Sequence, residues 1–261
     1  MTLSRLLALS VLAVALMSLV PVLVKSSSAN EVTIALARVW VAVLAFSPFM
    51  WWRGGLATLS RKDWLQLLVI GAVFAGHWLT YFISIKLSTP ALATLAITTF
   101  GVQYPLLAYF FNGERLNGFE MLAVVCCFGG CVIVTPQLSL ANETTLGVLV
   151  GLLSALLYAS LPLLHQRAGH ISTLPRTWAQ FFFAMLCFLP LWARSEWDLA
   201  PGDWYRLLAL GVLCTVIAHG LWVKVTTELP ALYVSMVYYL YLPSAMLTSA
   251  YFLGEEMTIR K

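Results

Sequence analysis

The chain repeats itself at a period near 140 residues. The segment from Gly113 reads Gly-Glu-Arg-Leu-Asn, and the segment from Gly254, 141 residues later (254 − 113 = 141), reads Gly-Glu-Glu-Met-Thr. Three further pairs share this offset to within one residue: Pro21 and Pro162, Asp63-Trp64 and Asp203-Trp204, and Gly71 and Gly211. A doubled unit of this length is typical of transporters built from internal repeats when both copies are strongly apolar.

The residues are too apolar for a water-soluble domain. Hydrophobic residues make up 61% of the 261 residues and charged residues 10%, with a mean hydropathy of +0.88, whereas soluble domains carry about 25% charged residues. The first long apolar run, Leu3–Val24, can span a bilayer, for which about 20 residues suffice. Because it matches the run Leu146–His165 in the second copy, we interpret it as a membrane helix and not as a signal peptide.

Nine apolar segments follow one another with mostly short connections. They lack the alternating pattern of an outer-membrane barrel, so the predicted fold is all-α, a polytopic membrane protein. The expected membrane helices are Leu3–Val24, Val32–Trp52, Trp64–Ile85, Ser88–Phe111, Gly118–Leu138, Thr145–His165, Thr173–Ala193, Trp204–Val225 and Leu229–Leu253.

The segments divide into a five-helix repeat, residues 1–140, and a four-helix repeat, residues 141–261. Because five is odd, the second copy enters the membrane upside down, which gives an inverted repeat. A 5+5 arrangement is expected and a 5+4 arrangement is present, since the counterpart of Gly118–Leu138 would begin near residue 259 (118 + 141 = 259). Asn117 is the expected cap of the fifth helix, and Thr258 takes its place in the second copy. We therefore expect the natural reading frame to continue through a tenth helix.

The charges favour a cytoplasmic N-terminus in the inner membrane. With the N-terminus inside, the inner connections hold eight lysines and arginines and the outer ones hold six, in keeping with the positive-inside rule. The net charge of +4 is scattered and offers no patch for nucleic acid. The five cysteines form no Cys-x-x-Cys pair, so we expect packing roles, with no metal and no cofactor. The expected partners are a small-molecule solute and the lipid bilayer, with the chain as a monomer or homodimer.

Three stretches carry a resemblance to a known family. Lys86–Asn117 reads KLSTPALATLAITTFGVQYPLLAYFFNGERLN, with small residues, a proline midway and Gly-Glu-Arg-Leu near its end. His77 lies in AGHWLTYFISIKLS and Arg38 in IALARVWVAVLAF. Together these stretches resemble the EamA-type repeat of the drug/metabolite transporter superfamily. The resemblance implies ten helices, cytoplasmic termini, a central cavity between the halves, and export of small organic solutes such as amino acids, metabolites or drugs.

Polar side chains inside the apolar segments are the candidate site residues, because such groups are costly in lipid and tend to face a cavity or a partner. Arg38 lies about two turns into the second segment, where it either binds an anionic solute or extends to the headgroups. His77 and Tyr81 share a helix face with Ser84. They either line the solute path, with His77 as a proton relay, or His77 bonds to a neighbouring helix. His219 in the eighth segment is a loose counterpart of His77.

The fourth and ninth segments are equivalent helices of the two copies, and such helices approach each other near the membrane midplane, where solutes bind. Their polar residues either line a cavity or bond between helices. The candidates here are Thr98, Gln103, Ser235, Tyr238 and Tyr239. Trp178 in the seventh segment is a further candidate. Gly147 and Gly151 form a small-residue face suited to close helix packing.

The absence of certain sequence motifs reduces the number of possible functions. No Gly-x4-Gly-Lys nucleotide-binding motif and no His-Glu-x-x-His pattern occurs, so neither direct use of ATP nor metalloprotease chemistry is indicated. No Asp or Glu lies deep inside a segment, which favours uncoupled transport or exchange, or a histidine-based proton step. We predict a secondary transporter, not an enzyme, that moves a small organic solute by alternating access through a central cavity. The alternatives are an exchanger of phosphorylated sugars or nucleotide sugars, and a membrane scaffold or sensor.

Overall fold

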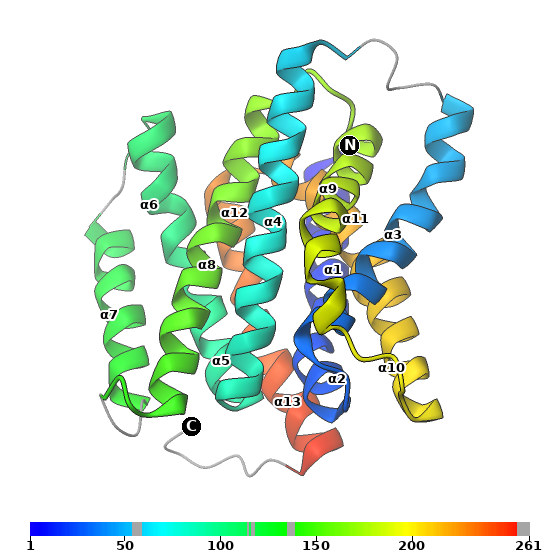
Figure 1. Ribbon diagram of the computed structural model, residues 1–261. Helices are drawn as coiled ribbons and strands as arrows, with labels where there is room; N and C mark the ends of the chain where they lie inside the picture. The colour runs from blue at the N-terminus through cyan, green and yellow to red at the C-terminus, as the bar shows by residue number, and fades with distance from the viewer. Residues whose placement is uncertain (54–58, 114, 116–117, 135–138, 255–261) are drawn as a thin grey trace.

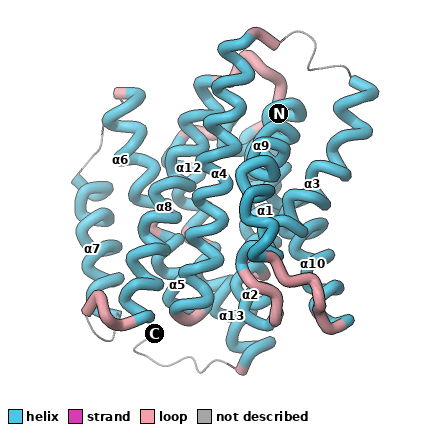
Figure 2. Tube along the Cα trace, viewed as in Figure 1, coloured by secondary structure: helices cyan, strands magenta, loops and turns pink. Residues whose placement is uncertain are grey.

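The computed structural model describes residues 1–53, 59–113, 115, 118–134 and 139–254, and the regular secondary structure of these residues is entirely helical (Figure 1, Figure 2). This confirms the predicted all-α fold. The elements are α1 (Leu3–Met17), α2 (Val20–Ser26), α3 (Glu31–Arg53), α4 (Arg61–Leu87), α5 (Pro90–Thr98), α6 (Phe100–Asn112), α7 (Gly118–Val134), α8 (Glu143–Arg167), α9 (Thr173–Phe188), the 3-10 helix η1 (Leu189–Arg194), α10 (Pro201–Gly211), the π-helix η2 (Val212–Ile217), α11 (Ala218–Glu228), α12 (Ala231–Tyr238) and α13 (Tyr241–Leu253).

Eight stretches of the described chain are long and apolar enough to cross a membrane, and they coincide with eight of the nine predicted segments. The remaining segment is α7, whose described part has 17 residues and whose predicted end at Leu138 lies outside the described residues. The count of nine spans is therefore not confirmed. The predictions that rest on Asn117 and Thr258 also fall outside the described residues.

The two copies run in opposite directions. In Figure 1, α4 descends from the face of the molecule where α1 begins, whereas α10 and α11, which take the place of α4 in the second copy, ascend toward that face. The face at the top of Figure 1 is termed the N-terminal face, and the other is termed the opposite face. The chain is thus doubled in sequence and inverted in space, as expected of an inverted repeat.

The fourth and ninth membrane segments are broken at equivalent places. The fourth consists of α5 and α6, which meet at Thr99, and the ninth consists of α12 and α13, which meet at Tyr239 and Leu240. Each ends on a glycine with a positive φ, 70° at Gly113 and 65° at Gly254. Glycine adopts this left-handed conformation without a steric penalty and commonly closes a helix with it, which explains why the two glycines recur 141 residues apart.

A second pair of recurring glycines lets the halves pack closely. Gly71 on α4 lies against α9, where an added Cβ would overlap Phe183 Cβ. Gly211 on α10 lies against α3, where an added Cβ would lie 2.8 Å from Val41 Cβ. Each contact joins a helix of one copy to a helix of the other, and the two contacts are equivalent under the repeat.

The predicted small-residue face of α8 is confirmed. A Cβ at Gly147 would lie 2.8 Å from Ser88 Cβ, and one at Gly151 would lie 2.7 Å from Ala96 Cβ. The Ser84 hydroxyl donates to the Gly147 carbonyl at 2.7 Å. Helix α8 of the second copy therefore packs directly on α4 and α5 of the first.

The second copy carries one extra residue in the counterpart of α4. Helix α4 has 27 residues, whereas the equivalent span Pro201–Glu228 has 28 and contains the π-turn η2. A π-turn adds a residue to a helix without ending it. The buried positions of α4 recur at an offset of 140 before the turn and 141 after it: Leu67 and Leu207, Ile70 and Leu210, Gly71 and Gly211, then Trp78 and His219, Tyr81 and Trp222, and Phe82 and Val223.

Candidate functional site

The two halves meet around a small internal cavity. Its volume is about 20 Å³, which is room for about one water molecule. A cavity of this size is too small for an organic solute. Because helices of both copies line it, it widens when the halves separate. The lining residues are Met17, Val20, Arg38, His77, Trp78, Tyr81, Ile97, Tyr158, His219, Tyr238 and Tyr241.

Arg38 of α3 reaches this cavity with its guanidinium group only partly paired. The residue is 1% exposed, and Nε donates to the Thr215 hydroxyl of η2 at 2.9 Å. The guanidinium carbon lies 3.9 Å from the centroid of the Trp78 ring, a cation–π arrangement that offsets part of the cost of burial. Within the described residues, Nη2 has no hydrogen-bond partner. A buried arginine with an unused donor is suited to bind an anion.

The hydroxyl that holds Arg38 belongs to the π-turn. Thr215 donates its own hydrogen to Leu210 O at 2.7 Å, five residues earlier, which leaves oxygen lone pairs to accept from Arg38. At the 140-residue offset, the counterpart of Thr215 in α4 is Ala75, which has no hydroxyl. The site is therefore asymmetric, with the cation on the first copy and the positioning hydroxyl on the second.

His77 of α4 is fixed against α8. Its Nδ1 lies 3.1 Å from Ser154 O and 2.9 Å from Ser154 Oγ, and Ser154 Oγ donates to His77 O at 2.8 Å. Because a carbonyl oxygen can only accept, the first contact assigns a proton to Nδ1. The imidazole also stacks on the Tyr158 ring at a centroid distance of 4.3 Å. His77 thus both bonds to a neighbouring helix and lines the cavity.

A pair of tyrosines links the halves beside the cavity. The hydroxyl oxygens of Tyr81 on α4 and Tyr241 on α13 lie 2.6 Å apart, so one hydroxyl donates to the other. Tyr238 stacks on Tyr241 at a centroid distance of 5.3 Å and contacts the Phe100 ring at 4.5 Å. These rings give the cavity apolar walls with hydroxyl groups at their ends.

His219 of α11 lies among aromatic rings at the same cavity. Its ring centroid is 5.4 Å from that of Phe74 and 5.5 Å from that of Trp78. In the register that the π-turn sets, His219 is the counterpart of Trp78 and not of His77. The described residues contain no group of three or more His, Cys, Asp or Glu side chains that could hold a metal ion.

Five of the ten predicted site residues line the cavity, and five lie elsewhere. Those at the cavity are Arg38, His77, Tyr81, His219 and Tyr238. The Thr98 hydroxyl bonds within its own helical segment, where it donates to Thr94 O at 2.6 Å. Gln103 Nε2 donates to the Thr99 hydroxyl at 2.8 Å and also to Leu152 O of α8 at 3.4 Å. Gln103 borders a separate apolar space of about 430 Å³ between α6, α7 and α8.

Two of the last three predicted residues, Trp178 and Tyr239, contact other elements. Trp178 donates from its indole nitrogen to the Ser47 hydroxyl of α3 at 3.0 Å. The Tyr239 ring covers Gly101 of α6, where an added Cβ would lie 2.6 Å from the ring. Ser235 is buried on α12, and its hydroxyl has no hydrogen-bond partner among the described residues.

Some residues at the site were not among the candidates from sequence. Trp78 carries the face on which Arg38 rests, and Thr215 holds the guanidinium. Met17 and Val20 line the cavity on either side of the break between α1 and α2. A tryptophan or a threonine in an apolar segment gives no signal of its own. The offset of the repeat changes from 140 at Gly71 and Gly211 to 141 at Gly113 and Gly254, which indicates an extra residue between these positions but does not single out Thr215.

A wider cleft lies toward the N-terminal face, between α3, α9 and α11. Its volume is about 640 Å³, and Thr173, Thr177 and Lys224 are among its lining residues. Phe46 in its wall stacks on Phe181 at a centroid distance of 6.0 Å, and Phe181 contacts the Trp78 ring at 6.1 Å. A chain of aromatic side chains therefore connects the cleft to the wall of the central cavity.

The chain has similar proteins of known family and known structure. The EamA-like transporter family matches residues 5–135 and 145–261. The uncharacterized transporter YxxF of Bacillus subtilis (strain 168) is 24% identical over 226 residues, which cover 85% of this chain and 70% of the relative. A crystal structure of another protein aligns with 99% of this chain and 92% of its own at a TM-score of 0.73 and 19% identity. The structural likeness shows a shared fold.

Proposed function

This chain belongs to the EamA-like transporter family, and we propose that it is a secondary transporter that carries a small organic solute by alternating access. It is a multi-pass membrane protein, with eight described stretches able to span a bilayer. In this proposal the inverted halves separate first on one face and then on the other. The cavity between them widens on each opening and holds the solute in between.

One observation carries the proposal for the solute: a buried arginine with an unused donor stands in an aromatic cavity. A carboxylate would accept from Nη2 of Arg38, and such charge-assisted hydrogen bonds are roughly twice as strong as neutral ones. The apolar part of the solute would lie against the rings of Trp78, Tyr158 and Tyr238. An amino acid, or a similar small carboxylic acid with an apolar body, has this chemistry.

A phosphorylated solute fits less well. Arg38 is the one lysine or arginine among the described residues that line the cavity. A phosphate dianion taken out of water needs compensation for two charges, and a single guanidinium supplies one. This observation favours a carboxylate over a sugar phosphate or a nucleotide sugar.

The coupling and direction of transport follow as parts of the same proposal. The described lining residues include no Asp or Glu, which supports uncoupled transport or exchange, with a proton step at His77 as the second possibility. The charge distribution supports a cytoplasmic N-terminus, and the family resemblance supports export across the inner membrane.

Solute flux into proteoliposomes tests the proposal. The purified chain would be reconstituted and offered radiolabelled amino acids, the matching amino acid amides, and a sugar phosphate. We expect saturable flux of the acids and little of the amides. Because a hydrogen bond to a charged group contributes about 1.5–3 kcal/mol, Arg38→Gln is expected to lower the apparent affinity at least tenfold.

The matched control is Arg5→Gln, which removes an exposed cation near the N-terminus and is expected to leave flux unchanged. Equal flux of acids and amides, or flux indifferent to Arg38→Gln, would refute the carboxylate proposal. No flux of any solute from monodisperse protein would refute the transporter proposal and favour a scaffold or sensor.

A further inference from the structure

Two aspartates occupy equivalent positions at opposite membrane faces. Asp63 is the third residue of α4 at the N-terminal face, and Asp203 is the third residue of α10 at the opposite face. They lie 140 residues apart (203 − 63 = 140). Each contacts a turn that belongs to the other half of the molecule.

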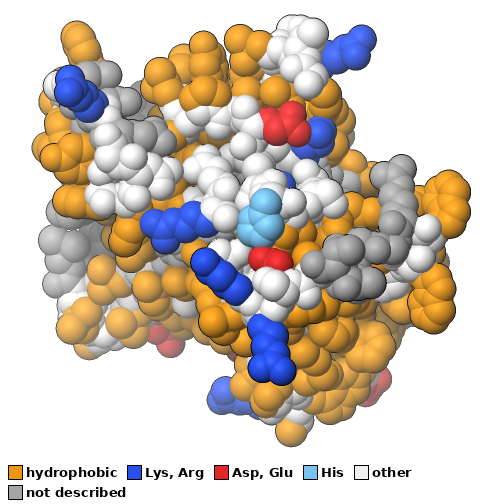
Figure 3. Space-filling view, turned by 90° about the horizontal axis from the view of Figure 1, so that it is seen from above, with side chains coloured by type: hydrophobic (Ala, Val, Ile, Leu, Met, Phe, Trp, Pro, Cys, Tyr) orange, Lys and Arg blue, Asp and Glu red, His pale blue; other side chains and the backbone are white. Residues whose placement is uncertain are grey.

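At the N-terminal face, Asp63 of the first half contacts the turn between α8 and α9 of the second half. Its Oδ1 lies 2.7 Å from His170 Nε2. Its Oδ2 accepts from the backbone nitrogen of Ser60 at 2.9 Å and so caps the start of α4. The two oxygens therefore have separate tasks, one within α4 and one between the halves. Figure 3 looks onto this face and shows acidic, basic and histidine side chains gathered near its centre.

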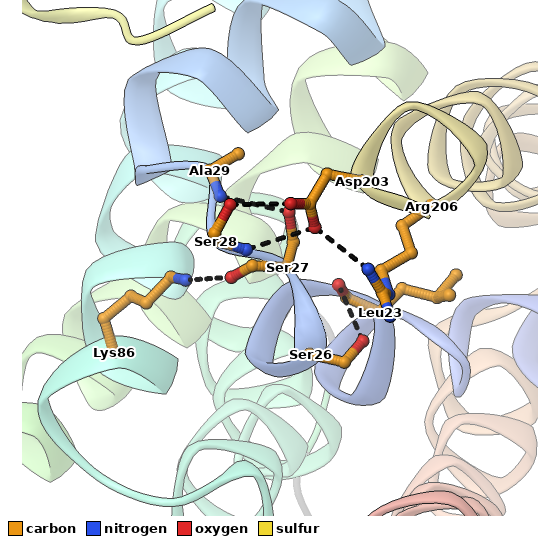
Figure 4. Close-up of polar contacts among 8 residues, drawn as sticks. All are labelled: Leu23, Ser26, Ser27, Ser28, Ala29, Lys86, Asp203 and Arg206. Carbon is orange, nitrogen blue, oxygen red and sulfur yellow. Dashed lines mark hydrogen bonds and ion pairs between the residues drawn. The ribbon is translucent and has the colours of Figure 1, made fainter. Parts of the chain in front are cut away.

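At the opposite face, Asp203 of the second half contacts the turn between α2 and α3 of the first half (Figure 4). Its Oδ2 accepts from the Ser28 hydroxyl at 2.6 Å, and its Oδ1 accepts from the Ser28 backbone nitrogen at 3.2 Å. Arg206 of the same helix donates to Oδ1 at 3.0 Å. The Asp203 side chain is 4% exposed, whereas those of Asp63 and His170 are 14% and 57% exposed.

A cation ties each turn to its own half. At the opposite face, Lys86 at the end of α4 donates to Ser27 O at 3.0 Å (Figure 4). At the N-terminal face, Arg176 donates to Ile171 O at 2.8 Å and to the Thr227 hydroxyl near the end of α11 at 3.0 Å. Each turn is therefore bound to its own half, and its bond to the aspartate crosses to the other half.

From this arrangement we infer that Asp63–His170 and Asp203–Ser28 are a matched pair of latches that close the solute path at the N-terminal face and at the opposite face, respectively. The inference rests on the proposed alternating-access function. Both latches are closed here, and the cavity between them has a volume of about 20 Å³. Opening at one face separates the halves there and breaks that latch, while the other latch holds.

The test measures, from each face separately, how fast a cysteine in the cavity is labelled. Ile97→Cys, at a cavity position that is 1% exposed, would be placed in a chain whose five natural cysteines are replaced by alanine. Oriented vesicles would be treated with a membrane-impermeant thiol reagent. His170→Ala is expected to speed labelling from the N-terminal face, and Asp203→Asn to speed labelling from the opposite face.

The two effects are expected to differ in size. The Asp63–His170 contact is partly open to solvent, and exposed pairs of this kind contribute little free energy. His170→Ala is therefore expected to change the labelling rate about two- to fivefold. The buried Asp203 contact involves hydrogen bonds to a charged group, so Asp203→Asn is expected to change labelling about tenfold or more. His170→Arg keeps a hydrogen-bond donor opposite Asp63 and is expected to restore the original rate.

The matched control is Glu228→Gln, which removes an ion pair with Lys224 (2.6 Å) inside one helix and is expected to alter neither rate. Acceleration from the same face by both latch variants, or no change in either, would overturn the inference. If Asp203→Asn fails to fold, a reducible disulfide between Ser28→Cys and Asp203→Cys replaces it, and must block labelling from the opposite face. The assay needs no solute, so flux with unchanged labelling would refute the latches alone, and latch effects without flux would refute transport alone.

Discussion

Replacing Gly211 by alanine is expected to destabilise the contact between the halves. An added Cβ would lie 2.8 Å from Val41 Cβ and 2.9 Å from each of its methyl carbons. Valine in a helix holds essentially one χ1 rotamer, so Val41 cannot turn away and α10 must move from α3. Overpacking costs about 1–3 kcal/mol, and three contacts below 3 Å place this case at the upper end. Alanine regains about 1 kcal/mol through helix propensity, so a net loss of about 2 kcal/mol is expected.

Thermal unfolding in detergent measures this loss. One kcal/mol corresponds to roughly 2–4 °C for chains of 150–250 residues, so the midpoint is expected to fall by about 4–8 °C. Gly129→Ala on α7 is the matched control, because no described atom lies within 4 Å of an added Cβ there, and its midpoint is expected to hold or rise. Adding Val41→Ala to Gly211→Ala removes two of the three clashing carbons and is expected to recover part of the loss. A wild-type midpoint for Gly211→Ala, or no recovery with Val41→Ala, would refute the reasoning.

Three further outcomes are expected. Thr215→Val removes the acceptor of Arg38 Nε and is expected to raise the KM for solute flux about tenfold. Thr215→Ser keeps the hydroxyl and is expected to leave the KM unchanged. An unchanged KM in the valine variant would mean that the hydroxyl does not position Arg38. Tyr81→Phe and Tyr241→Phe are each expected to lower the free energy of unfolding by about 1 kcal/mol, measured by thermal unfolding. The double variant is expected to lose little more than either single variant, because each substitution breaks the same hydrogen bond between the two hydroxyls. A loss in the double variant equal to the sum of the two single losses would contradict this. Gly113→Ala places a Cβ on a residue with φ of 70° and is expected to cost about 1–2 kcal/mol, so an unchanged unfolding midpoint would show that the left-handed cap is dispensable.

The helical fold and its doubling are predictable because both depend on properties of the chain alone. In lipid the backbone must satisfy its own hydrogen bonds, so long apolar runs become helices. The glycines at 113 and 254 recur because a left-handed turn needs them. The break between α5 and α6 lies inside the predicted segment Ser88–Phe111 and is not predictable from the sequence. The departure from the helix is small, because Thr99 keeps near-helical dihedrals, and the hydropathy of the segment does not change there.

The site is only half predictable, because rotation about a helix axis decides which side chains face the cavity. Tyr238 and Tyr239 are equally polar neighbours, but consecutive residues point about 100° apart. Tyr238 lines the cavity, while Tyr239 covers Gly101. A choice of site residues by polarity alone includes Thr98, although its hydroxyl bonds to its own helix. The same criterion omits Trp78, although its ring face supports Arg38.

The extra residue in the second copy breaks the equivalence of two otherwise matched halves. An insertion into a continuous α-helix would turn every later side chain by about 100° and point His219 and Trp222 away from the core. The π-turn absorbs that rotation within Val212–Ile217, so the scaffold stays symmetric while its chemistry does not. A transporter made of two identical halves would meet its solute in the same way from either side of the membrane. In this protein Arg38 comes from the first copy and the hydroxyl that holds it, Thr215, from the second. Under the proposed function, a molecule inserted upside down would therefore present a different cavity to a solute arriving from the same side of the membrane.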